Sequence, residues 1–112
     1  MDIVVKKSGS VDILCPNGRL DAYAANEVDQ KLNSFTDKAQ VCLVVNLEKV
    51  EYISSSGLRV LLAAVKKSRK KQGDIRLACL QPYVKEVFDI AGFTQLFKIF
   101  DNEEDAAQSF DG

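Results

Sequence analysis

The feature that most constrains the fold is a buried-strand pattern that leads, through a run of small residues, into a helix pattern. Residues Val41 to Asn46 form a β-branched apolar run, which is typical of a buried strand. Apolar side chains then recur at the spacing of one helix face, at Leu58, Leu61, Leu62 and Val65. The small residues Ser54 to Gly57 lie where a helix has unpaired N–H groups and a partial positive charge. The sequence therefore predicts a strand followed by a helix whose N-terminus can accept an anion.

The chain on either side of this segment alternates short strands with helices. Residues 3–7 and 11–15 are strand candidates separated by Ser8-Gly9-Ser10, which predicts a hairpin, and we expect the chain to turn at residues 16–18. Asp21 can cap the helix that follows. Beyond residues 48–51, which we expect to form a crossing segment, the patterns predict a helix at 55–71, a strand at 75–80, a helix from Pro82 to Gly92, a strand at 97–100 and a terminal helix after the acidic residues 101–105.

This order of elements predicts an α/β fold. Parallel strands joined by right-handed helical crossovers give a mostly parallel sheet with packed helices, here with four to five strands, an N-terminal hairpin and about four helices. With 112 residues, 46% of them hydrophobic, the chain is expected to form a single domain over residues 1–112.

Two glycines in and after the central helix carry separate predictions. Gly73 suits the left-handed position that ends a helix, after a basic last turn from Lys66 to Lys71 that we expect to be solvated and to complement the helix dipole. Gly57 lies in the first turn, where glycine costs up to about 1 kcal/mol relative to alanine. We therefore expect a close approach at Gly57, such as that of a kinase active site.

Composition excludes several classes of function. The net charge of −1 offers no field for nucleic acid or an anionic membrane, and no apolar run is long enough for a membrane span or a signal peptide, so we expect a cytoplasmic protein. The chain has no histidine, which removes Ser-His-Asp triads and mixed Cys/His zinc sites, and we expect no metal and no cofactor. The cysteines are scattered in strand-like runs and are expected to be buried structural thiols, at Cys15, Cys42 and Cys79.

The segment Asn46 to Leu62 resembles the signature of the STAS domain, found in bacterial anti-sigma factor antagonists and sulphate transporters. Gly18-Arg19-Leu20-Asp21 is similar to the G-x-L-D turn of that family, and the strand, proline and helix pattern of residues 78–92 also matches, so the resemblance covers nearly the whole chain. It implies a STAS-type fold. It also implies that a partner kinase phosphorylates a serine, because aligning the family pattern D-S-S-G-L on residues 54–58 puts the acceptor on Ser55, with Ser54 and Ser56 as the alternatives.

Further site residues are implied by the same resemblance. The surface that meets the anti-sigma factor would include Asp21, Ala22, Tyr23, Ser54, Ser56, Gly57, Leu58 and Arg59. The chain departs from the family at two of these positions, since the acidic residue before the acceptor is Ser54 and a commonly small residue is Arg59. Taken without the resemblance, Asp21 is only a helix cap, and the three serines only form a cap and a tight turn.

Three functions follow as hypotheses. The first is a non-enzymatic anti-sigma factor antagonist that, when unphosphorylated, binds an ATP-dependent anti-sigma factor serine kinase and releases a sigma factor, with a phosphatase that resets it. The second is a STAS regulatory subunit of a transporter or stress-signalling complex. The third is an enzyme with Ser55 as nucleophile, which is disfavoured because the nearest base, Lys66, is eleven residues further along the helix.

Overall fold

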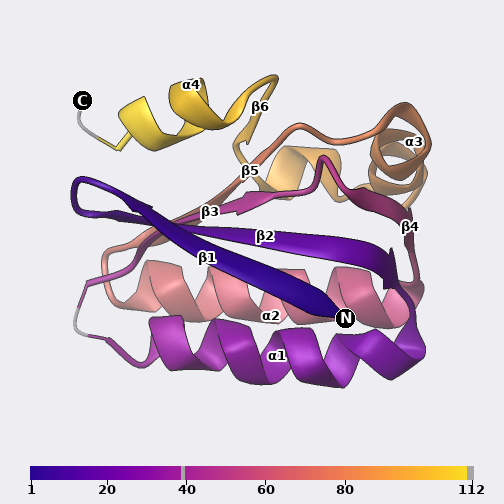
Figure 1. The fold of residues 1–112 in the computed structure, drawn as a ribbon, viewed down its shortest axis with the longest axis horizontal. Helices are drawn as coiled ribbons and strands as arrows, with labels where there is room; N and C mark the ends of the chain where they lie inside the picture. The colour runs from indigo at the N-terminus through magenta and orange to yellow at the C-terminus, as the bar shows by residue number, and fades with distance from the viewer. Residues whose placement is uncertain (39, 111–112) are drawn as a thin grey trace.

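The computed structural model describes residues 1–38 and 40–110. Within these residues the elements are, in order, β1 (Asp2–Ser8), β2 (Val11–Leu20), α1 (Ala22–Thr36), β3 (Cys42–Asn46), β4 (Val50–Ile53), α2 (Ser55–Lys70), β5 (Asp74–Ala78), α3 (Pro82–Ile90), the short 3-10 helix η1 (Thr94–Leu96), β6 (Ile99–Phe100) and α4 (Glu103–Gln108). Figure 1 shows α1 and α2 side by side against one face of the sheet, with α4 on the opposite face.

The sheet confirms the predicted fold class. Its strand order is β1-β2-β3-β5-β6; β1 and β2 form the expected antiparallel hairpin, and the pairs from β2 through β6 are parallel. The strand β4 lies off this path and pairs in parallel with the second half of β2. The described residues therefore contain six strands rather than the four to five expected from the sequence.

Two sequence predictions about the chain path were wrong. Residues 16–18 do not turn, because β2 continues through them to Leu20, with a register shift between Gly18 and Arg19 and with Gly18 at φ +124°. The predicted crossing segment at residues 48–51 is not irregular throughout, because Val50 and Glu51 begin the strand β4. The irregular step at Gly18 redirects β2, so that its first half pairs with β3 and its second half with β4.

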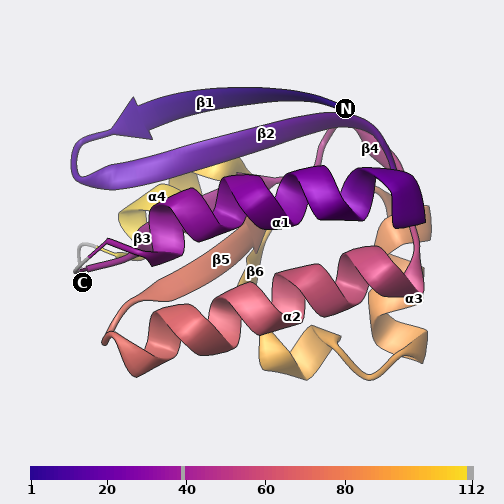
Figure 2. The same cartoon turned by 90° about the horizontal axis from the view of Figure 1, so that it is seen from below.

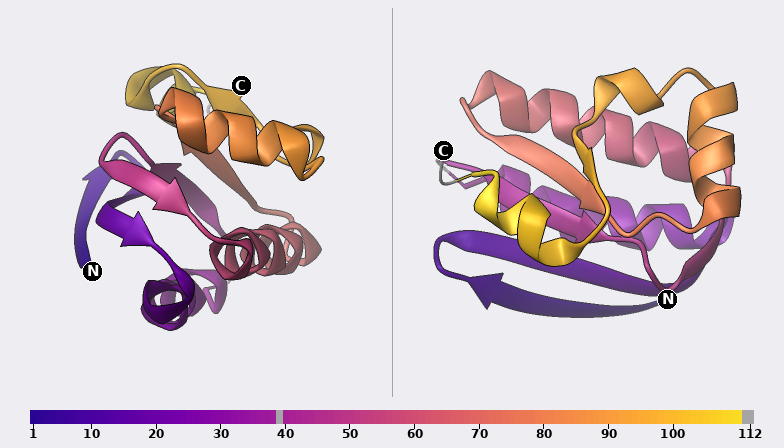
Figure 3. Two further views of the ribbon diagram at one scale, coloured as in Figure 1. Left: turned by 90° about the vertical axis from the view of Figure 1, so that its right-hand side faces the viewer. Right: turned by 90° about the horizontal axis from the view of Figure 1, so that it is seen from above.

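The hydrophobic core is divided between the two faces of the sheet. The larger cluster lies between the sheet and the helices α1, α2 and α3, and includes Leu14, Val28, Leu61 and Phe88, each fully buried. A smaller cluster lies under α4, where Ala106 and Ala107 pack against the sheet. Figure 3 shows this second layer from the side and from above.

The three cysteines contact the smaller cluster under α4. Cys15, Cys42 and Cys79 are free thiols, and they are half-buried rather than buried as expected. Cys15 lies in β2, Cys42 in β3 and Cys79 directly after β5, and all three side chains pack at the margin of the cluster. Burial raises the pKa of the thiols of Cys15 and Cys79, which favours the protonated form.

The end of α2 corrects the prediction for Gly73. The left-handed residue is Gln72, at φ +61°, whereas a Cβ on Gly73 would lie 2.2 Å from the carbonyl oxygen of Val41. Glycine is required there because the chain passes close to the start of the β3 segment. The basic last turn is solvated as expected at Lys66, Arg69 and Lys70, which are exposed, whereas the Lys71 Nζ donates to the carbonyl oxygen of Thr36 at 2.7 Å.

No helix among residues 1–38 and 40–110 combines the length and the apolar character needed to cross a bilayer.

Candidate functional site

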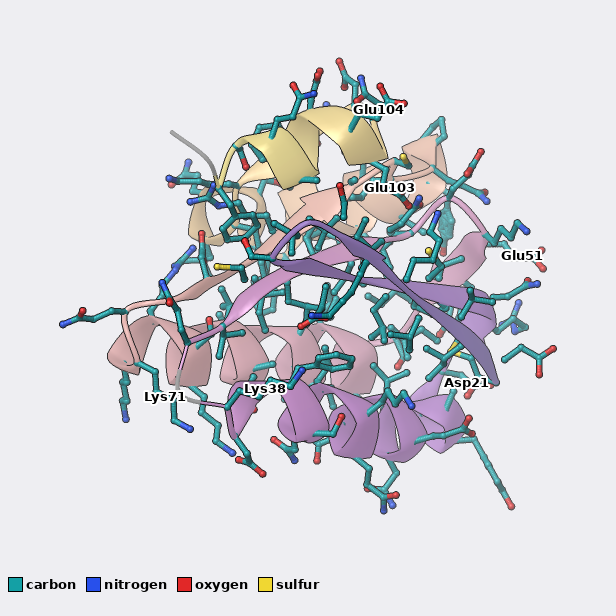
Figure 4. All side chains as sticks on the ribbon, turned by 60° about the vertical axis from the view of Figure 1, so that its left-hand side comes forward. Asp21, Lys38, Glu51, Lys71, Glu103 and Glu104 are labelled. Atoms are coloured by element: carbon teal, nitrogen blue, oxygen red, sulfur yellow. The ribbon has the colours of Figure 1, made fainter. Side chains whose placement is uncertain are left out.

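The parallel pairing of β2 with β4 brings the two predicted site turns together. Leu20 lies opposite Ile53 in the register, and the Ser54 N–H donates to the carbonyl oxygen of Leu20 at 2.9 Å. Each strand ends at this point and leads directly into a helix, β2 into α1 and β4 into α2. The starts of the two helices therefore lie side by side, at the end of the molecule where Figure 4 labels Asp21 and Glu51.

A side-chain cap begins each of these helices. The Asp21 Oδ1 accepts a hydrogen bond from the Ala24 N–H at 2.9 Å, and the Ser54 Oγ accepts one from the Gly57 N–H at 3.1 Å. Both residues are half-buried; the structure confirms the predicted cap at Asp21 and shows that Ser54 is the serine of the cluster that caps α2. The caps hold the two turns in a fixed conformation, because each satisfies a backbone donor that the helix itself cannot pair.

The three serines differ in how accessible they are. Ser55 is the first residue of α2 and is exposed, whereas Ser54 and Ser56 are half-buried. The hydroxyl of Ser54 is engaged in the cap, and Ser56 faces the neighbouring helix α1 across a groove. Ser55 therefore presents the most accessible hydroxyl of the cluster.

Glycine is required at position 57 by packing within the domain and not by the approach of a partner protein. It is buried, and a Cβ at this position would lie 2.8 Å from the Cγ of Leu20 and 3.0 Å from the Cγ1 of Ile53. The expectation that a kinase active site needs access at Gly57 was therefore wrong. The glycine instead lets α2 begin directly against the ends of β2 and β4, which positions the serines beside Asp21.

A shallow groove of about 450 Å³ runs between the N-terminal parts of α1 and α2. Its walls are formed by Ala22, Tyr23, Ala25, Asn26, Asp29, Ser56, Arg59 and Val60. Tyr23 is 95% exposed, which is unusual for an aromatic side chain and makes it the most prominent apolar group at this end of the molecule.

The predicted site residues are brought together, but they do not all reach the surface. Ala22, Tyr23, Ser56 and Arg59 line the groove, and Asp21 and Ser54 lie at its start. Gly57 is buried, and Leu58 is only 5% exposed. These two residues therefore pack beneath the groove and do not form part of its exposed surface.

Sequence reasoning missed four groove residues, Ala25, Asn26, Asp29 and Val60. Asn26 and Asp29 follow Ala22 at intervals of four and three residues, and Val60 follows Ser56 at four. These are the spacings that place side chains on one helix face, so the periodicity carried a usable signal. A second missed feature is Arg19, whose guanidinium carbon lies 4.3 Å from the ring centre of Tyr52 beside the paired strand ends.

The helix geometry gives no base to Ser55 along α2. Lys66 lies eleven residues further along, about 16 Å at the rise of an α-helix. That distance exceeds hydrogen-bond reach several times over, so the pairing considered in the enzyme hypothesis does not form.

Comparison with known families and relatives agrees with this geometry. The STAS domain family matches residues 2–106. BtrV of Bordetella bronchiseptica, a protein assigned to the anti-sigma factor antagonists, is 36% identical over 110 residues, covering 98% of this chain and 95% of its own. The anti-sigma-B factor antagonist of Listeria monocytogenes is 29% identical over 99 residues, covering 88% of this chain and 86% of its own.

Three solved structures share the fold. A STAS domain protein from Planctomyces limnophilus superimposes with a TM-score of 0.91 at 20% identity, covering all of both chains. The Bacillus cell fate determinant SpoIIAA in its phosphorylated form gives a TM-score of 0.75 at 19% identity, covering 97% of this chain and 99% of its own. The murine anion transporter Slc26a9 gives 0.76 at 17% identity, covering 89% of this chain but only 17% of its own.

Proposed function

Because the chain belongs to the STAS domain family, we propose that it is an anti-sigma factor antagonist controlled by phosphorylation of Ser55. The observation that carries the proposal is the exposed Ser55 at the start of α2, beside the groove between α1 and α2. The relatives from Bordetella bronchiseptica and Listeria monocytogenes, both named as anti-sigma factor antagonists, support the same role. The unphosphorylated protein would bind an anti-sigma factor and release the sigma factor that it holds.

Ser55 is preferred as the acceptor because the hydroxyl of Ser54 is already used in the helix cap and Ser56 faces α1. A phosphate on Ser54 would remove the cap that the Gly57 N–H donates to, at a cost of about 1 kcal/mol. Ser56 is half-buried against α1, which restricts access for a kinase. Modification of Ser55 disturbs neither the cap nor the packing between the helices.

The physical effect of the modification is a change of surface charge on a rigid scaffold. A phosphoserine carries a charge of roughly −1.5 to −2 near neutral pH. At the first residue of α2 this charge lies near the positive end of the helix dipole, so the domain tolerates it. Arg59 follows Ser55 by four residues, the spacing of neighbours on one helix face, and can pair with the phosphate.

The partner surface is the exposed part of the groove. Tyr23 supplies an aromatic side chain and Arg59 a guanidinium, the types of residue that dominate binding energy in protein interfaces. An unmodified Ser55 adjoins this surface without charge. A phosphate at the same place would have to be desolvated against the partner, at a cost of several kcal/mol if it were fully buried.

The partner is then an ATP-dependent serine kinase that is itself the anti-sigma factor, and a phosphatase resets the switch. The proposed switch itself needs no cofactor, and with these partners we propose a cytoplasmic protein. The site acts as a binding surface and not as a catalytic centre, with Ser55 as the acceptor of the phosphoryl group.

Phosphorylation mapping with single-serine variants tests the proposal. Kinase recovered by affinity capture from a lysate of the native organism is incubated with ATP and each purified variant, followed by intact mass and peptide mapping. Ser55→Ala is expected to abolish phosphorylation and leave stability unchanged, whereas the matched variant Ser54→Ala is expected to lose about 1 kcal/mol of stability and still accept phosphate.

Two results would overturn this assignment. Phosphate found only on Ser54 or Ser56 would move the acceptor. Capture of membrane transporter subunits, with no kinase among the recovered proteins, would replace the antagonist role by that of a transporter regulatory subunit.

A further inference from the structure

The outer edge of β1 offers a surface that the proposed switch does not use. The path of the sheet ends at β1 and β6, and β6 has only two residues whereas β1 has seven. Figure 2 shows β1 along the rim of the molecule, beyond β2. Val4 and Val5 on this strand are 56% and 43% exposed. A long edge strand with exposed apolar side chains is a template for pairing with another strand.

The register of the hairpin identifies which backbone groups of β1 face outward. Ile3 lies opposite Pro16, which has no N–H, so this pair cannot be one of the hydrogen-bonded pairs of the hairpin. Because hydrogen-bonded and non-hydrogen-bonded pairs alternate, the N–H and C=O groups of Ile3, Val5 and Lys7 point away from β2. These groups form a row of donors and acceptors along the edge.

We propose that this edge pairs with the β1 edge of a second copy of the chain, antiparallel about a two-fold axis at Val4. In this register Ile3 of each copy exchanges two hydrogen bonds with Val5 of the other, which uses outward-facing groups on both sides. The two Val4 side chains meet at the axis, in the closer spacing of a non-hydrogen-bonded pair. The two sheets then continue into each other.

Charge complementarity favours a second copy of the chain as the partner of this edge and sets the register in which the two β1 strands pair. Asp2, Val4 and Lys6 alternate on one face of β1, and pairing about Val4 puts Asp2 of each copy opposite Lys6 of the other. This gives two cross-strand ion pairs of opposite charge, which favour strand pairing. If one strand is shifted by two residues relative to the other, Val4 lies opposite Lys6 or opposite Asp2, depending on the direction of the shift. Both ion pairs are then lost.

Lysines on an edge strand commonly oppose such pairing, but here each lysine also has a carboxylate of its own chain close by, which lowers the repulsion between the two copies. Lys6 Nζ lies 3.0 Å from Glu103 Oε2 of α4, and Lys7 Nζ lies 3.7 Å from Asp12 Oδ1 of β2. The edge of β1 therefore repels a second copy less than its two lysines suggest. A strand pair of this length buries less than the roughly 1,200 Å² of a standard interface, so the dimer is of the weak, concentration-dependent kind.

The dimer surface and the switch surface are separate. Figures 2 and 3 show α1 between β1 and α2, so pairing through β1 leaves the N-terminus of α2 open to a partner. Two antagonist sites would then be presented by one continuous sheet.

Sedimentation velocity and amide NMR over a wide concentration range test the dimer. We expect the mass to rise from one chain to two, and hydrogen exchange to slow at the amides of Ile3 and Val5 but not at Val4. Val5→Pro removes an outward N–H that the monomer does not use and is expected to weaken the dimer at least tenfold. The matched control Val4→Thr keeps a β-branched side chain at the axis and is expected to dimerise within about threefold of the wild type.

A second variant covers the case in which the proline prevents folding. Asp2→Lys leaves the backbone intact, places like charges opposite Lys6 of the other copy, and is expected to weaken the dimer by a factor that falls as salt rises. A single-chain mass at every concentration would overturn the proposal. So would a dimer that both variants retain, or one in which the exchange rates of Ile3 and Val5 do not change.

Discussion

The substitution Gly57→Ala separates two opposing effects at the start of α2. Alanine has a higher helix propensity than glycine by up to about 1 kcal/mol, so on propensity alone the change would stabilise the domain. The structure predicts the opposite, because the new Cβ would lie 2.8 Å from the Cγ of Leu20 and 3.0 Å from its carbonyl oxygen. Neither atom can move freely: the Leu20 side chain is fully buried, and its carbonyl accepts the Ser54 N–H at 2.9 Å.

The magnitude follows from the difference between these effects. Overpacking of this kind costs about 1–3 kcal/mol, and the gain in propensity offsets up to about 1 kcal/mol of it. We therefore expect Gly57→Ala to lower the free energy of unfolding by about 1–2 kcal/mol. With a urea slope of about 2 kcal/mol/M, the middle of the range for small domains, the unfolding midpoint should fall by roughly 0.5–1 M.

Urea denaturation followed by circular dichroism measures this change, with Ala63→Gly as the control. Ala63 is exposed in the same helix, so its replacement reports the propensity alone and should cost about 0.5–1 kcal/mol. If Gly57→Ala proved as stable as the wild type or more so, the close contact with Leu20 would not constrain this helix start, and the argument for Gly57 as an internal packing position would fail.

Three further predictions concern other contacts. Burial opposes ionisation of Glu103, but the hydrogen bonds from Asn46 and Lys6 outweigh it and hold the pKa of the carboxyl below its ordinary value. The carboxylate therefore contributes to stability above about pH 4.3, and this contribution is lost as the pH falls through the folded-state pKa. Glu103→Gln should cost about 1–2 kcal/mol at neutral pH in thermal melts, and a constant difference between the variant and the wild type down to pH 3 would refute this. Arg59→Gln should destabilise the Ser55-phosphorylated form by a few tenths of a kcal/mol more than the unmodified form in denaturant melts at low salt, and an equal effect on both forms would remove the proposed pair. Gln72→Gly should be neutral or stabilise by up to about 1 kcal/mol, since Gln72 has a positive φ, whereas Gly73→Ala should destabilise by more than about 2 kcal/mol in the same assay, and the reverse order would contradict the close approach of Val41.

Local patterns in the sequence were sufficient for most of the fold. The periodicity of the residues after Leu58 and the caps at Asp21 and Ser54 are properties of neighbouring residues, and the structure confirms them. The strand β4 was missed because it has only four residues, one of them the strand-disfavouring Glu51, and because its pairing with β2 depends on a change of register at Gly18 that no local pattern records.

The candidate site was predictable at its centre and less so at its margins. The resemblance to the STAS family identified the serine cluster, and the helix spacing could have added Asn26 and Asp29. The roles of Gly57 and Gly73 could not be predicted, because both depend on atoms distant in the sequence, at Leu20 and Val41. A glycine in a helix turn indicates a close approach without saying what approaches.

The most direct test of the central claim is the affinity of the purified anti-sigma factor kinase for this protein with and without phosphate on Ser55, measured by titration calorimetry. The unmodified protein and Ser55→Ala are expected to bind equally well, because a small neutral residue adjoins the groove in both. The phosphorylated protein is expected to bind at least about tenfold more weakly, since a loss of 1.4 kcal/mol is enough for that and desolvation of a charge costs more. Equal affinities for the phosphorylated and unmodified forms would contradict a switch operated by charge at Ser55.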